Sequence, residues 1–319
     1  MKEQLKKDIY HQLSVEESKL LKKSIMEDVE FVNVLPKEDK RVYKTSWRMA
    51  TSLALCAIFI FSVILNMRPM AVVAIDVNPA IELKVNKKER VTEVILHNEQ
   101  AQMVVGDMDL KHVDIEVAIH AIIGKMFQQG YLTNTKNTML LTVQSDDTKY
   151  RKQLKDMLVR DIETSYQMYD TPIALLSQEL NMHSHYQSVA QQYNISEGKA
   201  SLIMEIIEGN ENYQFENFVK MSIQDIQTLV HYKNIAYQSI TAQGVESHDG
   251  YLTIDELKKI VSNHSNTTVI DFEYELECDD NRLVYEVEFT DGLAEYDYEI
   301  NAISGEVIKF AVELYDFDD

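Results

Sequence analysis

Residues 70–85 read MAVVAIDVNPAIELKV, and this stretch decides how the chain begins to fold. Residues 70–76 and 81–85 are rich in β-branched and aliphatic side chains, which favour strands. Between them stands Asn78-Pro79, and proline cannot donate a backbone hydrogen bond to a sheet. The stretch therefore predicts two strands joined by a turn.

The residues that follow extend this pattern into a mixed domain. Residues 90–97 alternate as a further strand, and apolar residues recur at helical spacing from Ile115 to Phe127. Residues 138–143 predict another strand, and residues 147–168 an amphipathic helix. We expect a compact α+β domain over 69–168, followed by a helical region over 169–240.

The C-terminal part shows the clearest alternation in the chain. Phe272, Tyr274 and Leu276 are interleaved with glutamates, and Asp291-Gly292 is a hairpin signal. We expect a helix followed by an antiparallel meander over 250–319, after a linker at 239–250. Its acidic face is either a solvated surface or a site for a basic ligand or divalent cation.

Upstream lies MATSLALCAIFIFSVILNM, residues 49–67, which contains no charged side chain. A helix of this length spans close to the ~30 Å hydrocarbon core of a bilayer. A cleaved signal peptide fits badly, because a polar region of about fifty residues precedes the segment. We expect a single transmembrane helix over 48–68. The basic residues before it, Lys37 to Arg48, indicate a cytoplasmic N-terminus and an extracellular C-terminus at the cell membrane.

Composition excludes several classes of protein. The 319 residues carry a formal charge of −21, which disfavours binding to nucleic acid. The two cysteines, Cys56 and Cys278, cannot form a Cys-x-x-Cys zinc motif, and no cofactor or metal site is evident. No nucleophile–base pair or phosphate-binding loop appears, so an enzyme that acts on other molecules is not expected.

The first segment, residues 1–47, predicts two short amphipathic helices. Leu20, Leu21 and Ile25 belong to the apolar stripe of the second helix. One interpretation is a solvated helix beside the membrane. The other is a partner-binding surface that docks as a helix in a groove.

The dipeptide Asn78-Pro79 also has a particular chemistry. Asparagine usually cyclises when the next backbone nitrogen attacks its side chain, but the nitrogen of Pro79 carries no proton and cannot do so. The remaining route is attack by the Asn78 amide on its own main-chain carbonyl, which expels Pro79 and cuts the chain. A plain turn is the alternative.

The membrane segment and the following VVAIDVNPAIELKVNKKERV resemble the start of the extracytoplasmic domain of RsgI-type anti-sigma-I factors. The residues that match the family motif are Asp76, Asn78, Pro79, Ile81, Glu82, Val85 and Asn86, and Ala80 replaces the usual serine. The resemblance implies self-cleavage between Asn78 and Pro79, with the two pieces held together by strand pairing. Residues 1–47 depart from the family, whose sigma-binding domain is small and β-rich.

The sequence YEVEFTDGLAEYDYEINAISGEVI, residues 285–308, resembles PepSY domains, which are linked to peptidase inhibition and extracytoplasmic regulation. Together the resemblances imply a single-pass membrane anti-sigma factor. Its cytoplasmic segment holds a sigma factor, its outer domains sense an unknown extracellular ligand, and membrane and site proteases relay the signal. The alternative is a membrane-anchored extracellular binding or peptidase-inhibiting protein with no cytoplasmic partner.

Overall fold

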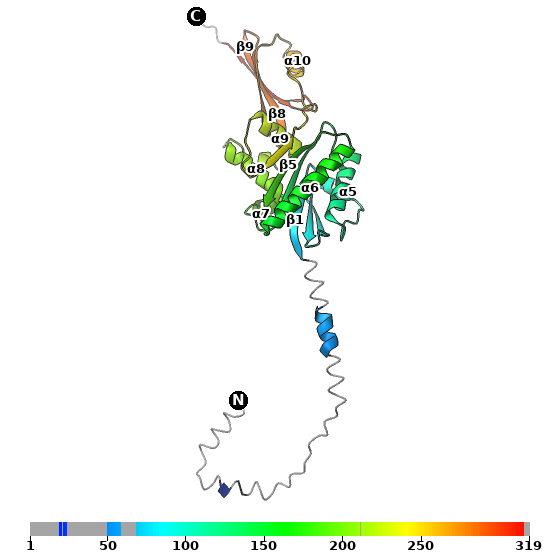
Figure 1. The fold of residues 1–319 in the computed structure, drawn as a ribbon. Helices are drawn as coiled ribbons and strands as arrows, with labels where there is room; N and C mark the ends of the chain where they lie inside the picture. The colour runs from blue at the N-terminus through cyan, green and yellow to red at the C-terminus, as the bar shows by residue number, and fades with distance from the viewer. Residues whose placement is uncertain (1–18, 21, 24–49, 59–67, 211, 316–319) are drawn as a thin grey trace. The chain divides into compact units, whose positions relative to one another are not determined.

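The computed structural model describes residues 19–20, 22–23, 50–58, 68–210 and 212–315 (Figure 1). The chain divides into two compact units, Met1–Phe61 and Ser62–Asp319. In the first unit residues 50–58 are helical, and Leu53, Leu55 and Ile58 are exposed. No helix in the described part of the chain is long and apolar enough to cross a membrane. Most of the helix expected over 48–68 lies outside the described residues.

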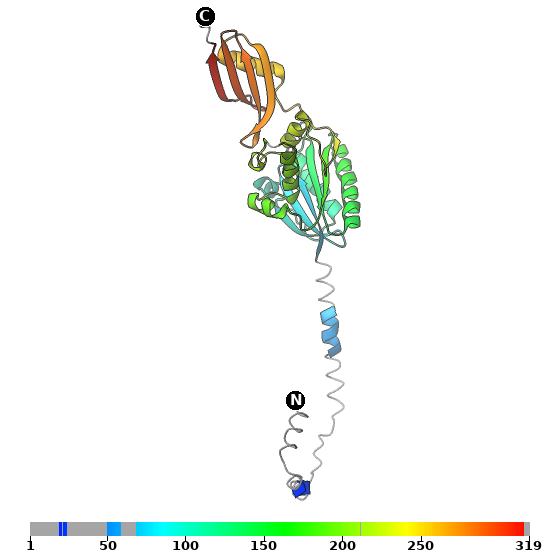
Figure 2. The same ribbon diagram turned by 90° about the vertical axis from the view of Figure 1, so that its left-hand side faces the viewer.

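The second unit begins with a mixed sheet that carries helices on both faces (Figures 1 and 2). Its strands are β1 (Pro69–Asp76), β2 (Ala80–Asn86), β3 (Val91–Leu96), β4 (Thr138–Gln144), β5 (Ala174–Leu180) and β6 (Thr241–Gly244). Its helices are α4 (Glu99–Val105), α5 (Ile115–Gln128), α6 (Thr148–Met168), α7 (Gln187–Tyr193), α8 (Glu197–Gly209), the 3-10 helix η1 (Phe215–Asn217) and α9 (Ile223–Tyr232).

The strand order of this sheet is β3-β2-β1-β4-β5-β6. Only β4 and β5 are parallel, and α6 makes the crossover between them. Strand β1 is internal, because it pairs with β2 from Pro69 to Asp76 and with β4 from Val72 to Asp76. The first strand of the unit is therefore held from both sides.

Two apolar cores cover the two faces of the sheet. One core joins residues such as Ile75 of β1 to Ile119 of α5 and Leu158 of α6. The other joins Leu140 of β4 and Leu176 of β5 to residues of α8 and α9. Strands that are buried on both faces need continuous apolar runs, which explains the VVAI sequence in β1.

The C-terminal part is an antiparallel sheet in the order β10-β9-β8-β7 with one helix packed against it (Figure 2). The elements are α10 (Ile254–Ser265), β7 (Ile270–Asp279), β8 (Arg282–Thr290), β9 (Ala294–Asn301) and β10 (Val307–Leu314). A capping box between Thr253 and Glu256 starts the helix. Leu257 and Val261 of α10 pack into one cluster with Val287 of β8.

The structure confirms a mixed α+β fold and the strands and helices expected between residues 70 and 168. It corrects two expectations further along the chain. Residues 174–180 form strand β5, although helix was expected throughout 169–240. The expected linker at 239–250 contains β6, which pairs with β5. Strand β5 is mostly buried and reads ALLSQEL, so it shows no clean alternation that could have identified it.

Candidate functional site

The turn between β1 and β2 places Asn78 and Pro79 at one end of the mixed sheet. Asp76, the last residue of β1, pairs with Ala80, the first residue of β2. Asn78 is exposed, whereas Pro79 and Ala80 are buried. Asn78 has a φ of 155°. Non-glycine residues rarely adopt such values, which cost on the order of 1–3 kcal/mol. The bond singled out in the sequence therefore follows a strained residue.

Asn98 contacts the chain on both sides of the Asn78–Pro79 bond. Its Nδ2 donates a hydrogen bond to Oδ1 of Asn78 at 3.3 Å, and its Oδ1 accepts one from the Ala80 backbone N–H at 3.4 Å. Asn98 is also the N-cap of α4, where its Oδ1 accepts from the N–H of Ala101 at 2.9 Å. The turn is thus fixed against the start of a helix, and the Asn78 amide is held through its oxygen rather than its nitrogen.

Asp76 is buried beside this turn, with 1% of its surface exposed. Its Oδ2 accepts a hydrogen bond from the Ser196 hydroxyl at 2.6 Å, while its Oδ1 has no hydrogen-bond partner among the described residues. Burial raises the pKa of Asp76 to about 6, although the bond from Ser196 acts in the opposite direction. Asp76 is therefore a carboxyl group that can hold or release a proton near neutral pH.

A histidine and a second carboxylate lie close to Asp76. Nε2 of His97 is 3.2 Å from Oε1 of Glu82, and both side chains are mostly buried. The backbone N–H of His97 donates to the carbonyl of Ala80 at 3.1 Å. Burial alone would lower the pKa of His97, but the Glu82 and Asp76 carboxylates outweigh burial and raise it. Asp76, Glu82 and His97 thus place ionisable side chains together next to the turn.

A cavity of ≈ 360 Å³ opens beside the same turn. Asn78 lines it together with Tyr251 and Ile303, which belong to the C-terminal part of the chain. Helix α9 also contacts the turn, because the N–H of Ile223 donates to the carbonyl of Val77 at 2.9 Å. The turn is therefore in physical contact with elements that lie far from it in the sequence.

The structure describes only some of the predicted site residues. Asn78 and Pro79 lie together at the turn just described. Leu20 is described and exposed, while Leu21 and Ile25 lie outside the described residues. The structure therefore gives no arrangement of the expected partner-binding stripe.

The roles of Asn98 and His97 and the contact between Ser196 and Asp76 were not predicted from the sequence. An N-cap signal was present, since Asn98 precedes an acidic residue and a short apolar run. Nothing local in the sequence indicates that its side chain also reaches Asn78. Ser196 shows only the signal of a helix cap, because its second partner is 120 residues away.

Two groups of side chains in the described part of the chain could hold a metal ion. One consists of Glu288, Glu295 and Asp297, which are all exposed. The other consists of His231, Glu246 and His248, in which the carboxylate is buried. The sequence was interpreted as having no metal site, and these residues were not recognised.

Residues 70–205 match the family described as anti-sigma factor RsgI-like central domain. Residues 251–310 match the family described as peptidase propeptide and YPEB domain, or PepSY. The strained turn, Asn98 and Ser196 all fall inside the first match. The turn and its neighbours therefore lie within the residues that match the RsgI-like central domain.

Relatives with curated names agree with this match. Anti-sigma-I factor RsgI of Bacillus subtilis (strain 168) is 28% identical over 134 residues, which cover 40% of this chain and 35% of that protein. Anti-sigma-I factor RsgI9 of Acetivibrio thermocellus is 24% identical over 161 residues, which cover 49% of this chain and 23% of that protein. The match therefore spans about a third or less of these relatives. This chain carries an RsgI-like anti-sigma factor domain followed by a C-terminal PepSY domain.

Proposed function

We propose that this chain is a single-pass membrane anti-sigma factor whose outer part is cut at its own Asn78–Pro79 bond. The observation that carries the proposal is the strained Asn78, held by Asn98 inside the RsgI-like domain. In this proposal residues 48–68 anchor the chain and residues 1–47 bind a sigma factor on the inside. The names of the relatives, all of them anti-sigma-I factors, support that choice of partner.

The proposed cleavage needs no second reactant. Nδ2 of Asn78 attacks the main-chain carbonyl carbon of the same residue and closes a five-membered imide. The bond from that carbon to the nitrogen of Pro79 breaks, the Nδ2 group loses a proton, and the leaving nitrogen gains one. The first piece then ends at residue 78, and the second begins at Pro79.

The surroundings of the turn favour this reaction in three ways. The bond between Asn98 and Asn78 fixes the amide group, so less conformational freedom is lost on the way to attack. The unusual φ of Asn78 raises the energy of the uncut chain. Asp76 stands two residues before Asn78 and has a pKa of about 6, and we propose that it moves the proton.

Cleavage alone would not separate the two pieces. Strand β1 stays on the N-terminal piece, while its two neighbours β2 and β4 stay on the C-terminal piece. We propose that an extracellular signal acts on this noncovalent joint, and that membrane and site proteases then process the anchored piece. The PepSY domain and α9 are candidates for relaying the signal, because they line the cavity beside the turn.

The test is intact mass spectrometry of the purified full chain after denaturation, since native strand pairing would hide the cut. We expect the wild type to give two pieces and Asn78→Ala to give only the full-length chain. Ala80→Ser should speed the reaction if a hydroxyl at this position assists it. A wild-type chain that stays intact after prolonged incubation would reduce the motif to a turn.

The PepSY match also favours a second candidate, a membrane-anchored protein that inhibits an extracellular peptidase. This function needs neither a cytoplasmic partner nor cleavage at Asn78. Peptidase inhibition that is unchanged in Asn78→Ala, together with no binding of a sigma factor, would favour it.

A further inference from the structure

We infer that His231, Glu246 and His248 form a binding site for a divalent transition-metal ion such as Zn²⁺. The three residues come from two segments, because His231 lies in the last turn of α9 and the other two lie in the connection between β6 and α10. One ligand atom from each residue lies within 4.8 Å of the others. Two imidazoles and one carboxylate are a ligand set suited to such ions.

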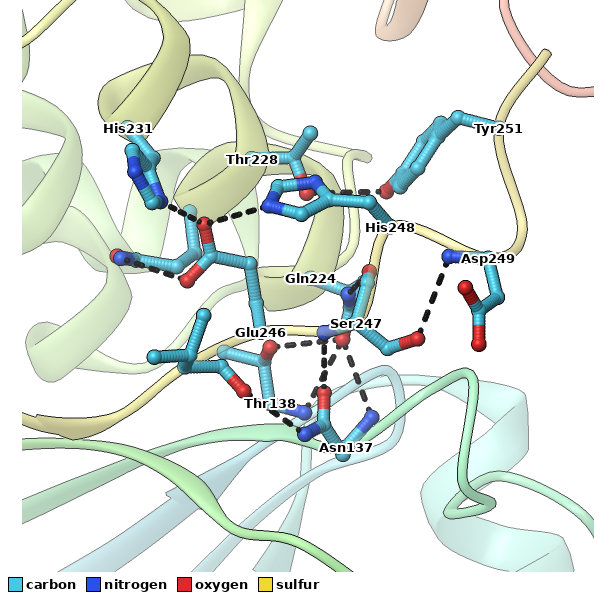
Figure 3. Close-up of polar contacts among 12 residues, drawn as sticks. Asn137, Thr138, Gln224, Thr228, His231, Glu246, Ser247, His248, Asp249 and Tyr251 are labelled. Carbon is cyan, nitrogen blue, oxygen red and sulfur yellow. Dashed lines mark hydrogen bonds and ion pairs between the residues drawn. The ribbon is translucent and has the colours of Figure 1, made fainter. Parts of the chain in front are cut away.

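The distances around Glu246 fit this inference. Nδ1 of His231 lies 2.6 Å and Nε2 of His248 lies 3.6 Å from the same carboxylate oxygen, Oε1 of Glu246 (Figure 3). Ligands of a tetrahedral zinc ion are roughly 3.3 Å apart, given metal–ligand bonds of about 2.0–2.2 Å. Small side-chain rotations would therefore open a space for the ion, and the metal would replace the contact between His231 and Glu246.

The carboxylate is built into the fold, whereas the imidazoles are accessible. The Glu246 side chain is 3% exposed, while those of His231 and His248 are 55% and 54% exposed. The second carboxylate oxygen, Oε2, accepts a hydrogen bond from Nε2 of Gln227 at 3.4 Å. An ion could thus enter from solvent and keep water in its remaining position, while Gln227 orients the buried ligand.

The backbone that carries Glu246 is fixed on both sides. The side chain of Asn137 donates to the carbonyl of Val245 at 3.1 Å and accepts from the N–H of Ser247 at 2.9 Å. Gln224 of α9 donates to the carbonyl of Ser247 at 2.7 Å. Figure 3 shows Asn137 and Gln224 beside Ser247, directly next to the His–Glu–His group. The position of the carboxylate is therefore set before any ion binds.

Charge also favours a cation at this point. His231 lies in the last turn of α9, where the helix dipole is negative and attracts positive charge. The chain as a whole carries a formal charge of −21, which raises the local concentration of divalent cations. A bound ion would tie the segment leading into the C-terminal domain to α9.

The test uses the untagged full chain in detergent, stripped of metal with a chelator. It is titrated with ZnCl₂ in competition with a chromophoric chelator, and the Co²⁺-loaded protein is examined for visible d–d absorption. We expect one tight Zn²⁺ per chain and a four-coordinate Co²⁺ spectrum. His231→Gln and His248→Gln should each weaken binding at least about tenfold and remove that spectrum. Both histidines are exposed, so these variants should fold.

Two further variants separate this site from other sources of binding. Glu246→Gln preserves the shape of the buried side chain and should also lose the ion. Glu288→Gln is the control, because it alters the exposed acidic group without touching the histidines. Zn²⁺ binding that is equal in the wild type and His248→Gln, or that is lost in Glu288→Gln, would overturn the inference.

Discussion

Asn98 performs two tasks with one side chain. Its oxygen accepts from the backbone, at the N-cap of α4 and from the N–H of Ala80, and its nitrogen holds the amide of Asn78. The two tasks use different atoms, so a substitution can remove one and keep the other. Asparagine can serve both, because its amide carries an acceptor and a donor.

The first residue-scale prediction follows from that division. Asn98→Asp keeps the oxygen that caps the helix but loses the donor to Asn78, so it should slow cleavage while leaving stability nearly unchanged. Asn98→Ala loses both and should also cost about 1 kcal/mol of unfolding free energy. The measurements are cleavage time courses by mass spectrometry and chemical denaturation. Equal cleavage rates in the wild type and Asn98→Asp would contradict a positioning role.

The second residue-scale prediction concerns Asp76 and the pH dependence of stability. Because burial raises its pKa from 3.8 to about 6, the folded state binds the proton more tightly than the unfolded state does. The stabilising effect of the protonated group is present below pH 4 and is lost as the pH rises toward 6 and above. Asp76→Asn should therefore stabilise the fold at pH 7 by up to about 3 kcal/mol, and by almost nothing at pH 4.

This comparison belongs in an Asn78→Ala background, where cleavage cannot interfere. His97 and Lys199 both feel the Asp76 carboxylate, so the difference between the two chains also includes the change in the pKa of these two groups. The measurement is denaturant unfolding at several pH values. A stability difference that does not depend on pH would mean that Asp76 has an ordinary pKa in the fold.

At the scale of elements, local patterns explain which predictions were right. Strands β1 and β2 could be predicted because branched aliphatic residues flank an obligatory turn. Strand β5 could not, because it is covered on both sides and its ALLSQ sequence is equally compatible with a helix. The internal position of β1 depends on its pairing with β4, about seventy residues away along the chain, and no local signal encodes such pairing.

The candidate site shows the same contrast between local sequence signals and tertiary contacts. Asn78 and Pro79 could be proposed from the sequence because their expected chemistry is contained in adjacent residues. The surroundings of the turn depend on contacts from Asn98, Ser196 and Ile223, which only the tertiary fold brings together. The His–Glu–His group was missed for the same reason, since its members come from a helix end and an apparent linker.

At the scale of the whole molecule, the proposed function requires that residues 1–47 bind a partner. Leu20→Asp or Ile25→Asp should release a bound sigma factor and raise transcription of its target genes, without altering membrane insertion. Met26→Asp introduces the same charge off the apolar stripe and serves as the matched control. The measurement is a pull-down combined with a reporter for the regulated promoter. Binding that persists in both stripe variants would leave the segment only as an anchor flank.

If the chain is cut as proposed, the internal position of β1 makes separation of the two pieces an event that happens once per copy. If β1 is withdrawn, β2 and β4 lose their shared neighbour, and each presents a row of unpaired backbone groups. The core that β1 shares with α5 and α6 would also lose the apolar side chains that β1 contributes. The C-terminal piece left behind would not be an intact domain that could bind the anchored piece again. Each copy could then report its signal once, and a return to the state before the signal would depend on newly made protein.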